Sequence, residues 1–315
     1  MFSKKKENNM DSKKNKLMVI YLLLFPLIIS AQNIILPLWE GNIPNSTNVG
    51  VEESNTSNHK YVIPKPEMAL YLPAKRNISG QAVLVIPGGG YHAIAYRWEG
   101  TDVAKWLNAN GIVAAVLKYR LPNDTTSNIV RYKSPLLDAS RAIRIIKANA
   151  EKWNIDKNNI GIMGFSAGGH IASTLGTHFN QEKSRDDKID SLSSRPDFMV
   201  LMYSVITMSE ESRHKGSTKN LLGENPSKEL LDYFSNEKHV TSDTPPTFLV
   251  HCSDDGVVRV KNSLLFYEAL IENNVSAEMH IYKKGRHGFS LANKKGYLNS
   301  WKNRCLDWLN NLNEK

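Results

Sequence analysis

The stretch that decides the fold is Ile160–Gly168, which reads Ile-Gly-Ile-Met-Gly-Phe-Ser-Ala-Gly. Its first six residues are apolar or glycine and predict a buried strand, and the residues from Ser166 to about His178 predict a helix. The pattern G-x-S-x-G at such a junction is typical of a sharp turn that lifts a serine hydroxyl above a sheet, beside the amides and dipole of the following helix. Ser166 is therefore the candidate nucleophile, and a plain turn of small residues is the alternative.

The rest of the chain repeats this alternation of strand and helix. Five further apolar runs predict strands at 82–86, 112–117, 198–203, 247–252 and 277–282. Helical periodicity predicts helices at 98–110, 136–153, 227–234, 262–273 and 296–312. Such alternation favours a mainly parallel sheet, and runs without period-two patterning indicate strands covered on both faces. We therefore expect an α/β fold, a central sheet flanked by helices, with residues 205–246 as a small cap-like insertion.

The N-terminus has the composition of an export signal. Residues 1–16 hold six lysines against one Glu and one Asp, and residues 17–29 are an unbroken apolar run followed by Ser30 and Ala31. This order predicts a secretory signal peptide at 1–31, and therefore an exported, periplasmic or secreted protein. An uncleaved membrane anchor is the alternative, but the run is shorter than the ~20 residues that a spanning helix needs. We expect no stable membrane insertion after cleavage.

The remaining chain reads as an irregular lead-in at 32–60, rich in Asn, Ser, Pro and Gly, and one catalytic domain at 61–315. The chain has a net charge of +9, of which the leader carries +4, and the remainder is scattered. No basic stripe with interleaved aromatics is visible, which excludes nucleic acid as a partner. Cys252 and Cys305 lie in no CxxC or Cys/His cluster, so we expect neither a metal site nor a disulfide scaffold.

A nucleophilic serine needs a base and a carboxylate that orients the base, here expected in the order Ser, Asp, His, each after a strand. His287 follows the strand at 277–282 and stands in a loop flanked by glycines. Asp254 and Asp255 both follow the strand at 247–252. Adjacent residues point in different directions, so only one can face His287. We take Asp254 as the triad acid and Asp255 as the turn cap, with the reverse assignment as the alternative.

A glycine-rich loop supplies the third part of the expected site. Residues 87–91, Pro-Gly-Gly-Gly-Tyr, follow the strand at 82–86. Glycines let backbone N–H groups turn toward a ligand, so Gly89, Gly90 and the Ala167 N–H are the expected oxyanion hole. Tyr91 and Trp98 are candidates for the wall that contacts the acyl group or sugar. The alternatives are a flexible turn or a phosphate loop, but a dinucleotide motif would need glycine at Ala93.

Together these motifs resemble the α/β-hydrolase superfamily, from about Tyr61 to the C-terminus. The glycine loop, Trp98-Glu99-Gly100 and Lys118-Tyr119-Arg120-Leu121-Pro122 are similar to the esterase/lipase branch related to hormone-sensitive lipase. Proline before the three glycines is similar to bacterial acetyl-xylan and feruloyl esterases. The resemblance implies a cofactor-free serine esterase that removes acetyl, or less commonly feruloyl, groups from plant-cell-wall xylan. Arg286 departs from the pattern, which has glycine there.

Two other functions are compatible with parts of the pattern. A prolyl-oligopeptidase-like peptidase shares the Asp-Asp-x-Val context at 254–257, but its large N-terminal propeller has no counterpart here. A non-catalytic carbohydrate-binding relative would not need the complete Ser, Asp, His and Gly set. A glycanase would need two carboxylates on either side of a glycosidic bond, whereas these motifs supply a serine triad.

Overall fold

The computed structural model describes residues 34–47, 52–122, 128–180, 187–209 and 211–312. Residues 31–315 form one compact unit. The signal peptide predicted at 1–31 lies outside the described residues and stays a prediction. Within the described ranges, no helix combines the length and apolar character that crossing a membrane requires.

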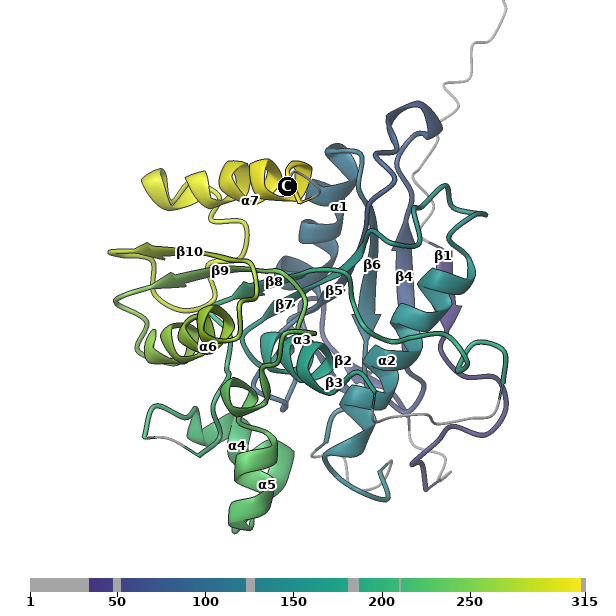
Figure 1. Ribbon diagram of the computed structural model, residues 1–315. Helices are drawn as coiled ribbons and strands as arrows, with labels where there is room; N and C mark the ends of the chain where they lie inside the picture. Colours follow the sequence, from purple (N-terminus) through teal and green to yellow (C-terminus); the bar gives the residue numbers. More distant parts are fainter. Residues whose placement is uncertain (1–33, 48–51, 123–127, 181–186, 210, 313–315) are drawn as a thin grey trace, which may run out of the picture. The chain divides into compact units, whose positions relative to one another are not determined.

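The unit is built on an eight-stranded sheet in the order β1-β4-β6-β5-β7-β8-β9-β10 (Figure 1). The strands are β1 (Ile34–Pro37), β4 (Glu67–Tyr71), β6 (Val113–Lys118), β5 (Ala82–Ile86), β7 (Ile160–Phe165), β8 (Met199–Met202), β9 (Thr247–Cys252) and β10 (Ala277–Tyr282). The six strands β6, β5, β7, β8, β9 and β10 pair in parallel. Strand β4 is antiparallel to β6, and β1 is antiparallel to β4. Two short strands, β2 (Ser54–Asn55) and β3 (Lys60–Val62), pair separately.

Both faces of the sheet are covered, which explains why the strands are continuously apolar. Along β5, Leu84 and Ile86 belong to one core cluster, and Val83 and Val85 to the other. The first cluster is closed by α2 (Lys133–Ala148), α3 (Ala167–His178) and α6 (Lys261–Glu272). The second is closed by α1 (Asp102–Ala109) and α7 (Trp301–Asn310), on the opposite face in Figure 1. The predicted mainly parallel sheet with helices on its flanks is confirmed.

Within the predicted irregular lead-in at 32–60, residues Ile34–Pro37 form a regular strand, β1, which the composition does not predict. Strand β1 pairs with β4 in the register Ile34↔Leu70, which makes it the edge strand of the sheet. Ile34 and Ile35 are 43% and 51% exposed. A short, exposed edge strand has little patterning of its own, because its regularity comes from the hydrogen bonds that β4 supplies.

The segment between β8 and β9 contains two short helices, α4 (Lys215–Leu222) and α5 (Lys228–Tyr233), and a 3₁₀ turn at Asn236–His239. Both helices have an N-cap residue whose side chain accepts a hydrogen bond from a backbone N–H group of the first turn. These residues are His214 for α4 and Ser227 for α5. The Asn220 amide of α4 donates a 2.8 Å hydrogen bond to the Gly90 carbonyl oxygen. The insertion is therefore anchored to the glycine loop that follows β5.

Candidate active site

Ser166 stands at the turn between β7 and α3. Its backbone has φ 52° and ψ −119°, a strained conformation for a residue other than glycine. The turn is also tight, since a Cβ atom on Gly168 would lie 2.1 Å from the Ile86 carbonyl oxygen. The glycine of the motif is therefore needed for close approach, and the strain is stored at the residue whose hydroxyl faces the end of the sheet.

The structure brings Ser166 and His287 together. The Nε2 atom of His287 lies 2.8 Å from the Ser166 Oγ, and its Nδ1 atom lies 2.7 Å from the Asp255 Oδ2. A carboxylate only accepts hydrogen bonds, so Nδ1 carries the proton and Nε2 is the acceptor for the serine hydroxyl. The three side chains come from loops after β7, β9 and β10, whose carboxyl ends lie at the same edge of the sheet.

The carboxylate that meets His287 belongs to Asp255, so the assignment of Asp254 as the triad acid is wrong. Asp254 is exposed and accepts the backbone N–H groups of Gly285 and Arg286, each at 2.8 Å. The side chains of the two aspartates that follow β9 point in different directions, and only that of Asp255 reaches the His287 ring. Asp254 instead fixes the backbone of the loop that carries His287.

Asp255 is held in its place by a dense set of donors. Its Oδ1 accepts the backbone N–H groups of Val257 and Val258, both at 2.9 Å, and its Oδ2 also lies 3.3 Å from the His251 Nε2. Burial alone would raise the pKa of Asp255, but the bonds to His251 and His287 outweigh burial and hold that pKa well below its ordinary range. The carboxylate is therefore ionised at neutral pH and well into the acid range.

The glycine loop has its carbonyl groups tied back. The Gly88 oxygen accepts from the Ala95 N–H at 2.8 Å. The Gly89 oxygen accepts from the N–H groups of His92 and Ala93, both at 3.0 Å. The Gly90 oxygen accepts from the Asn220 side-chain amide. In the described part of the chain, the N–H groups of Gly89, Gly90 and Ala167 donate to no protein acceptor. Gly89 has φ 131° and Gly90 φ 63°, which favour glycine. The loop thus has the composition and free donors of an oxyanion hole.

Tyr91 does not line a substrate wall as predicted. Its side chain is 1% exposed, and its hydroxyl lies 2.7 Å from the His170 Nδ1 on α3. The His170 Nε2 in turn lies 2.8 Å from the Phe234 carbonyl oxygen. Burial lowers the pKa of His170 to about 4, so its imidazole is neutral and donates to Phe234 while accepting from Tyr91. Tyr91 has φ 61°, and in this conformation its side chain reaches the core, where it anchors the loop.

Trp98 is half-buried and lies near the surface on a π-helical turn, Arg97–Thr101, that leads into α1. Its ring contacts the ring of His59 edge-on, with centroids 4.7 Å apart. Its carbonyl oxygen accepts from the hydroxyl of Ser290, three residues after His287. Trp98 is thus connected to the histidine loop, and its contact with substrate stays a prediction.

Two buried residues beside the site were missed by the sequence analysis. Glu99 is 3% exposed and accepts a 2.8 Å hydrogen bond from the Tyr203 hydroxyl. The Tyr203 ring contacts the His287 ring edge-on, with the two ring centroids 4.9 Å apart. Tyr203 directly follows β8, and the carboxyl ends of parallel strands are where site residues gather, so its position was a usable signal. Glu99 gave no such signal, because it lies in a turn whose partners are distant in the sequence.

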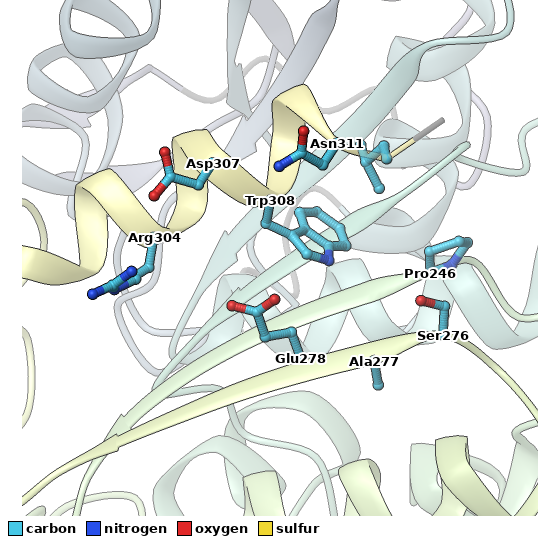
Figure 2. A pocket seen from close by; sticks show the side chains of 9 residues that line it. Pro246, Ser276, Ala277, Glu278, Arg304, Asp307, Trp308 and Asn311 are labelled. Carbon is cyan, nitrogen blue, oxygen red and sulfur yellow. The ribbon is translucent and has the colours of Figure 1, made fainter. Parts of the chain in front are cut away.

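One cavity lies away from the site. It measures about 540 Å³ and lies between α7 and the start of β10, lined by Glu278, Arg304, Asp307 and Trp308 among others (Figure 2). It is therefore at the opposite end of the strands from Ser166. Among the described residues, no three His, Cys, Asp or Glu side chains are grouped to hold a metal ion, and both cysteines are buried as free thiols.

This fold and sequence have counterparts among known proteins. The BD-FAE family model matches residues 68–270, which is more than half of the chain. The chain belongs to the BD-FAE family. An acetyl ester-xyloside bifunctional hydrolase from Caldicellulosiruptor lactoaceticus has a similar structure, with a TM-score of 0.77 and 40% identity over 90% of this chain and 98% of that one. The predicted α/β-hydrolase fold and esterase branch are confirmed.

Two curated proteins share substantial sequence with this BD-FAE member. Endo-1,4-beta-xylanase B of Butyrivibrio fibrisolvens is 39% identical over 75% of this chain and 36% of its own length. The acetylxylan esterase of Xylanibacter ruminicola is 34% identical over 79% of this chain and 48% of its own length. The chain therefore spans about a third to a half of these relatives, whose remaining parts have no counterpart in the match.

Proposed function

We propose that the protein is a serine hydrolase of carboxylic esters, with Ser166, His287 and Asp255 as its catalytic triad. The observation that carries the proposal is the continuous chain of contacts from Asp255 through His287 to the Ser166 hydroxyl, at 2.7 and 2.8 Å. It ends beside a glycine loop with free N–H groups. These are the base, the orienting carboxylate and the electrostatic donors that acyl transfer requires.

Each part has a defined role in the proposed reaction. The Ser166 Oγ attacks the ester carbonyl carbon while its proton passes to the His287 Nε2, and ionised Asp255 stabilises the resulting imidazolium. The oxyanion is stabilised by the N–H groups of Gly89, Gly90 and Ala167. The alcohol leaves with the proton from His287. Water then gives a proton to His287 and attacks the acyl carbon. The bond to the Ser166 Oγ breaks, the acid leaves, and His287 returns the proton to the Oγ, which restores the serine hydroxyl.

We propose acetyl groups on xylan as the natural substrate, with feruloyl groups as the second choice. The support comes from relatives whose names include acetylxylan esterase and acetyl ester-xyloside hydrolase. The glycine loop and the triad act on the atoms of the ester group, which all esters share, so these residues favour no particular alcohol. The choice of sugar therefore has to be made by surfaces around the triad, such as Trp98 and the 205–246 insertion.

A substrate panel tests the proposal. We expect hydrolysis of p-nitrophenyl acetate and of acetylated xylan, with weaker turnover of feruloylated arabinoxylan and long-chain p-nitrophenyl esters. Release of acetate and of p-nitrophenol is measured directly. Turnover of proline dipeptide amides alone would favour a peptidase, and p-nitrophenyl xyloside turnover that survives loss of Ser166 would indicate a separate glycosidic site. Binding of xylan without any hydrolysis would favour a carbohydrate-binding protein.

We also propose that the protein is exported and cleaved after Ala31. The support is the order of basic, apolar and small residues at 1–31. In a Gram-negative host, we expect the mature protein in the periplasm or medium, with Gln32 as its first residue by N-terminal sequencing. Recovery only in the membrane fraction, with the leader intact, would instead indicate an anchor.

A further inference from the structure

Glu99 is a buried carboxylate that the proposed reaction does not use. It is 3% exposed and accepts two hydrogen bonds at 2.8 Å, one from the Gly88 N–H and one from the Tyr203 hydroxyl. Burying a carboxylate costs several kcal/mol unless its oxygens are well satisfied. A carboxylate kept in this position therefore calls for an explanation, and its two partners lie on the two sides of the site.

The first partner is the glycine loop. A Cβ atom on Gly88 would lie 2.8 Å from the Ser166 Cβ and 2.9 Å from the Glu99 Oε2, so the carboxylate lies close behind the nucleophile. Glu99 accepts a hydrogen bond from the Gly88 N–H, and the Tyr119 hydroxyl donates one to the Pro87 carbonyl oxygen at 3.0 Å. Both polar groups of the Pro87–Gly88 peptide are thereby fixed, which sets the direction in which the following N–H groups leave the loop.

The second partner leads to the histidine. The Tyr203 hydroxyl donates to Glu99 and accepts from the Ser290 N–H at 3.0 Å, and the Tyr203 ring lies 4.9 Å from the His287 ring. Tyr203 has φ 39°, an unusual backbone conformation that its surroundings must hold in place. Glu99 therefore stabilises, through one side chain, both the ring that contacts His287 and the loop that carries it.

The charges around the His287 ring are also defined. The titratable side chains that face it are Asp255, Tyr203, Glu99 and His214. Burial raises the pKa of Tyr203 far above its ordinary value and lowers the pKa of His214, so both are neutral at neutral pH. Burial raises the pKa of Glu99 above its ordinary value, although the bonds from Tyr203 and Gly88 oppose that rise. Each Glu99 oxygen accepts a hydrogen bond from a donor, as a carboxylate does, so the two carboxylates beside an imidazolium here are Asp255 and Glu99.

We propose that Glu99 is a positioning residue of the active site, which orients the oxyanion loop through Gly88, braces His287 through Tyr203 and supplies a second negative charge near the imidazolium. The inference rests on the proposed function. During acyl transfer a proton moves from the serine to His287, and a nearby carboxylate in a dry environment favours that charge. Glu99 itself does not contact the reacting atoms.

The test compares Glu99→Gln, Glu99→Asp and Tyr203→Phe. A glutamine has only one acceptor oxygen, and its NH₂ group would face one of the two donors that Glu99 accepts from. We therefore expect kcat on p-nitrophenyl acetate to fall about 10- to 100-fold, with KM within about threefold of wild type. The acid limb of the kcat/KM profile should move to lower pH, because a negative charge that favours the imidazolium is lost. Aspartate keeps the charge but not the reach, so kcat should fall while the acid limb stays. Tyr203→Phe should give the smaller loss.

The matched control is Glu67→Gln, which removes a carboxylate on β4 that pairs with Lys118 of β6. Strands β6 and β5 separate β4 from β7, which leads to Ser166, so this change should leave kcat unchanged. Thermal melting checks that each variant folds. If Glu99→Gln does not fold, Glu99→Asp and Tyr203→Phe test the proposed role of Glu99 instead. A Glu99→Gln protein with kcat within twofold of wild type and an unmoved acid limb would overturn the proposal.

A fluorophosphonate separates this proposal from the proposed function. The reagent phosphonylates an activated serine whatever the natural ester: an O–P bond forms, fluoride leaves and the serine proton passes to the histidine. We expect Glu99→Gln to slow labelling of Ser166 by about tenfold or more. If the wild type labels but hydrolyses no ester, the proposed function fails and Glu99 is still judged by the labelling rate. Equal labelling rates in the two proteins would count against Glu99.

Discussion

Replacing Ser166 by alanine is expected to lower kcat for p-nitrophenyl acetate by about 10⁴-fold or more, the scale of loss found when a catalytic serine is removed. The reason is that the alanine methyl group can neither form the acyl-enzyme nor receive activation from His287 at 2.8 Å. Burst kinetics with wild type and variant at equal concentration would show the loss as a missing acylation phase.

The fold should survive this substitution. The Ser166 N–H donates to the Met202 oxygen, and its carbonyl oxygen accepts from the N–H groups of His170 and Val205, so none of these bonds involves the hydroxyl. We therefore expect a melting temperature close to that of wild type, by circular dichroism. An exposed serine, Ser191, gives the matched control, since Ser191→Ala should keep full activity. Wild-type-like turnover by the Ser166 variant would refute the proposed mechanism.

Asp255→Asn is expected to lower kcat by about 10³- to 10⁴-fold, whereas Asp254→Asn should lower it by less than about tenfold. An asparagine at 255 can present its NH₂ to the His287 Nδ1, which favours the wrong tautomer and leaves Nε2 protonated, unable to accept from Ser166. An asparagine at 254 can still accept the Gly285 and Arg286 N–H groups through its amide oxygen, so the loop should keep its shape.

Side-by-side kcat measurements across pH distinguish the two aspartates. Because the pKa of Asp255 is held well below its ordinary range, its ionisation does not set the acid limb of the wild-type profile. The 255 variant should therefore be slow at every pH rather than only in acid. The 254 variant should keep the wild-type profile with a slightly lower melting temperature. A larger loss at 254 than at 255 would contradict the geometry found here.

The parallel strands lie where the sequence predicts them, because a strand covered on both faces is apolar throughout and ends at clear turn residues. β5, β7, β9 and β10 have the predicted bounds. Strand β1 was not predicted, because its regularity depends on a distant partner rather than on its own pattern. The nucleophile and base were also placed, since strand ends, glycines and chain order constrain them strongly.

The remaining site features depend on orientation, which spacing does not encode. Asp254 and Asp255 differ only in which of two neighbours turns under His287. Tyr91 was misplaced because a positive φ turns its side chain into the core. Glu99 meets Tyr203 across 104 residues of sequence, so no local motif announces the pair. Such long-range polar contacts form only when the chain has folded, so they leave no pattern in the local sequence.

The contacts from the insertion to the glycine loop have a consequence for engineering. Asn220 holds the Gly90 oxygen, and Phe234 holds the His170 that anchors Tyr91, so the 205–246 segment supports the loop at two points. Exchanging this segment between relatives to change substrate preference would therefore also disturb the catalytic rate. A graft that retains the Asn220 side chain and the backbone position of Phe234, whose carbonyl oxygen contacts His170, should alter specificity alone.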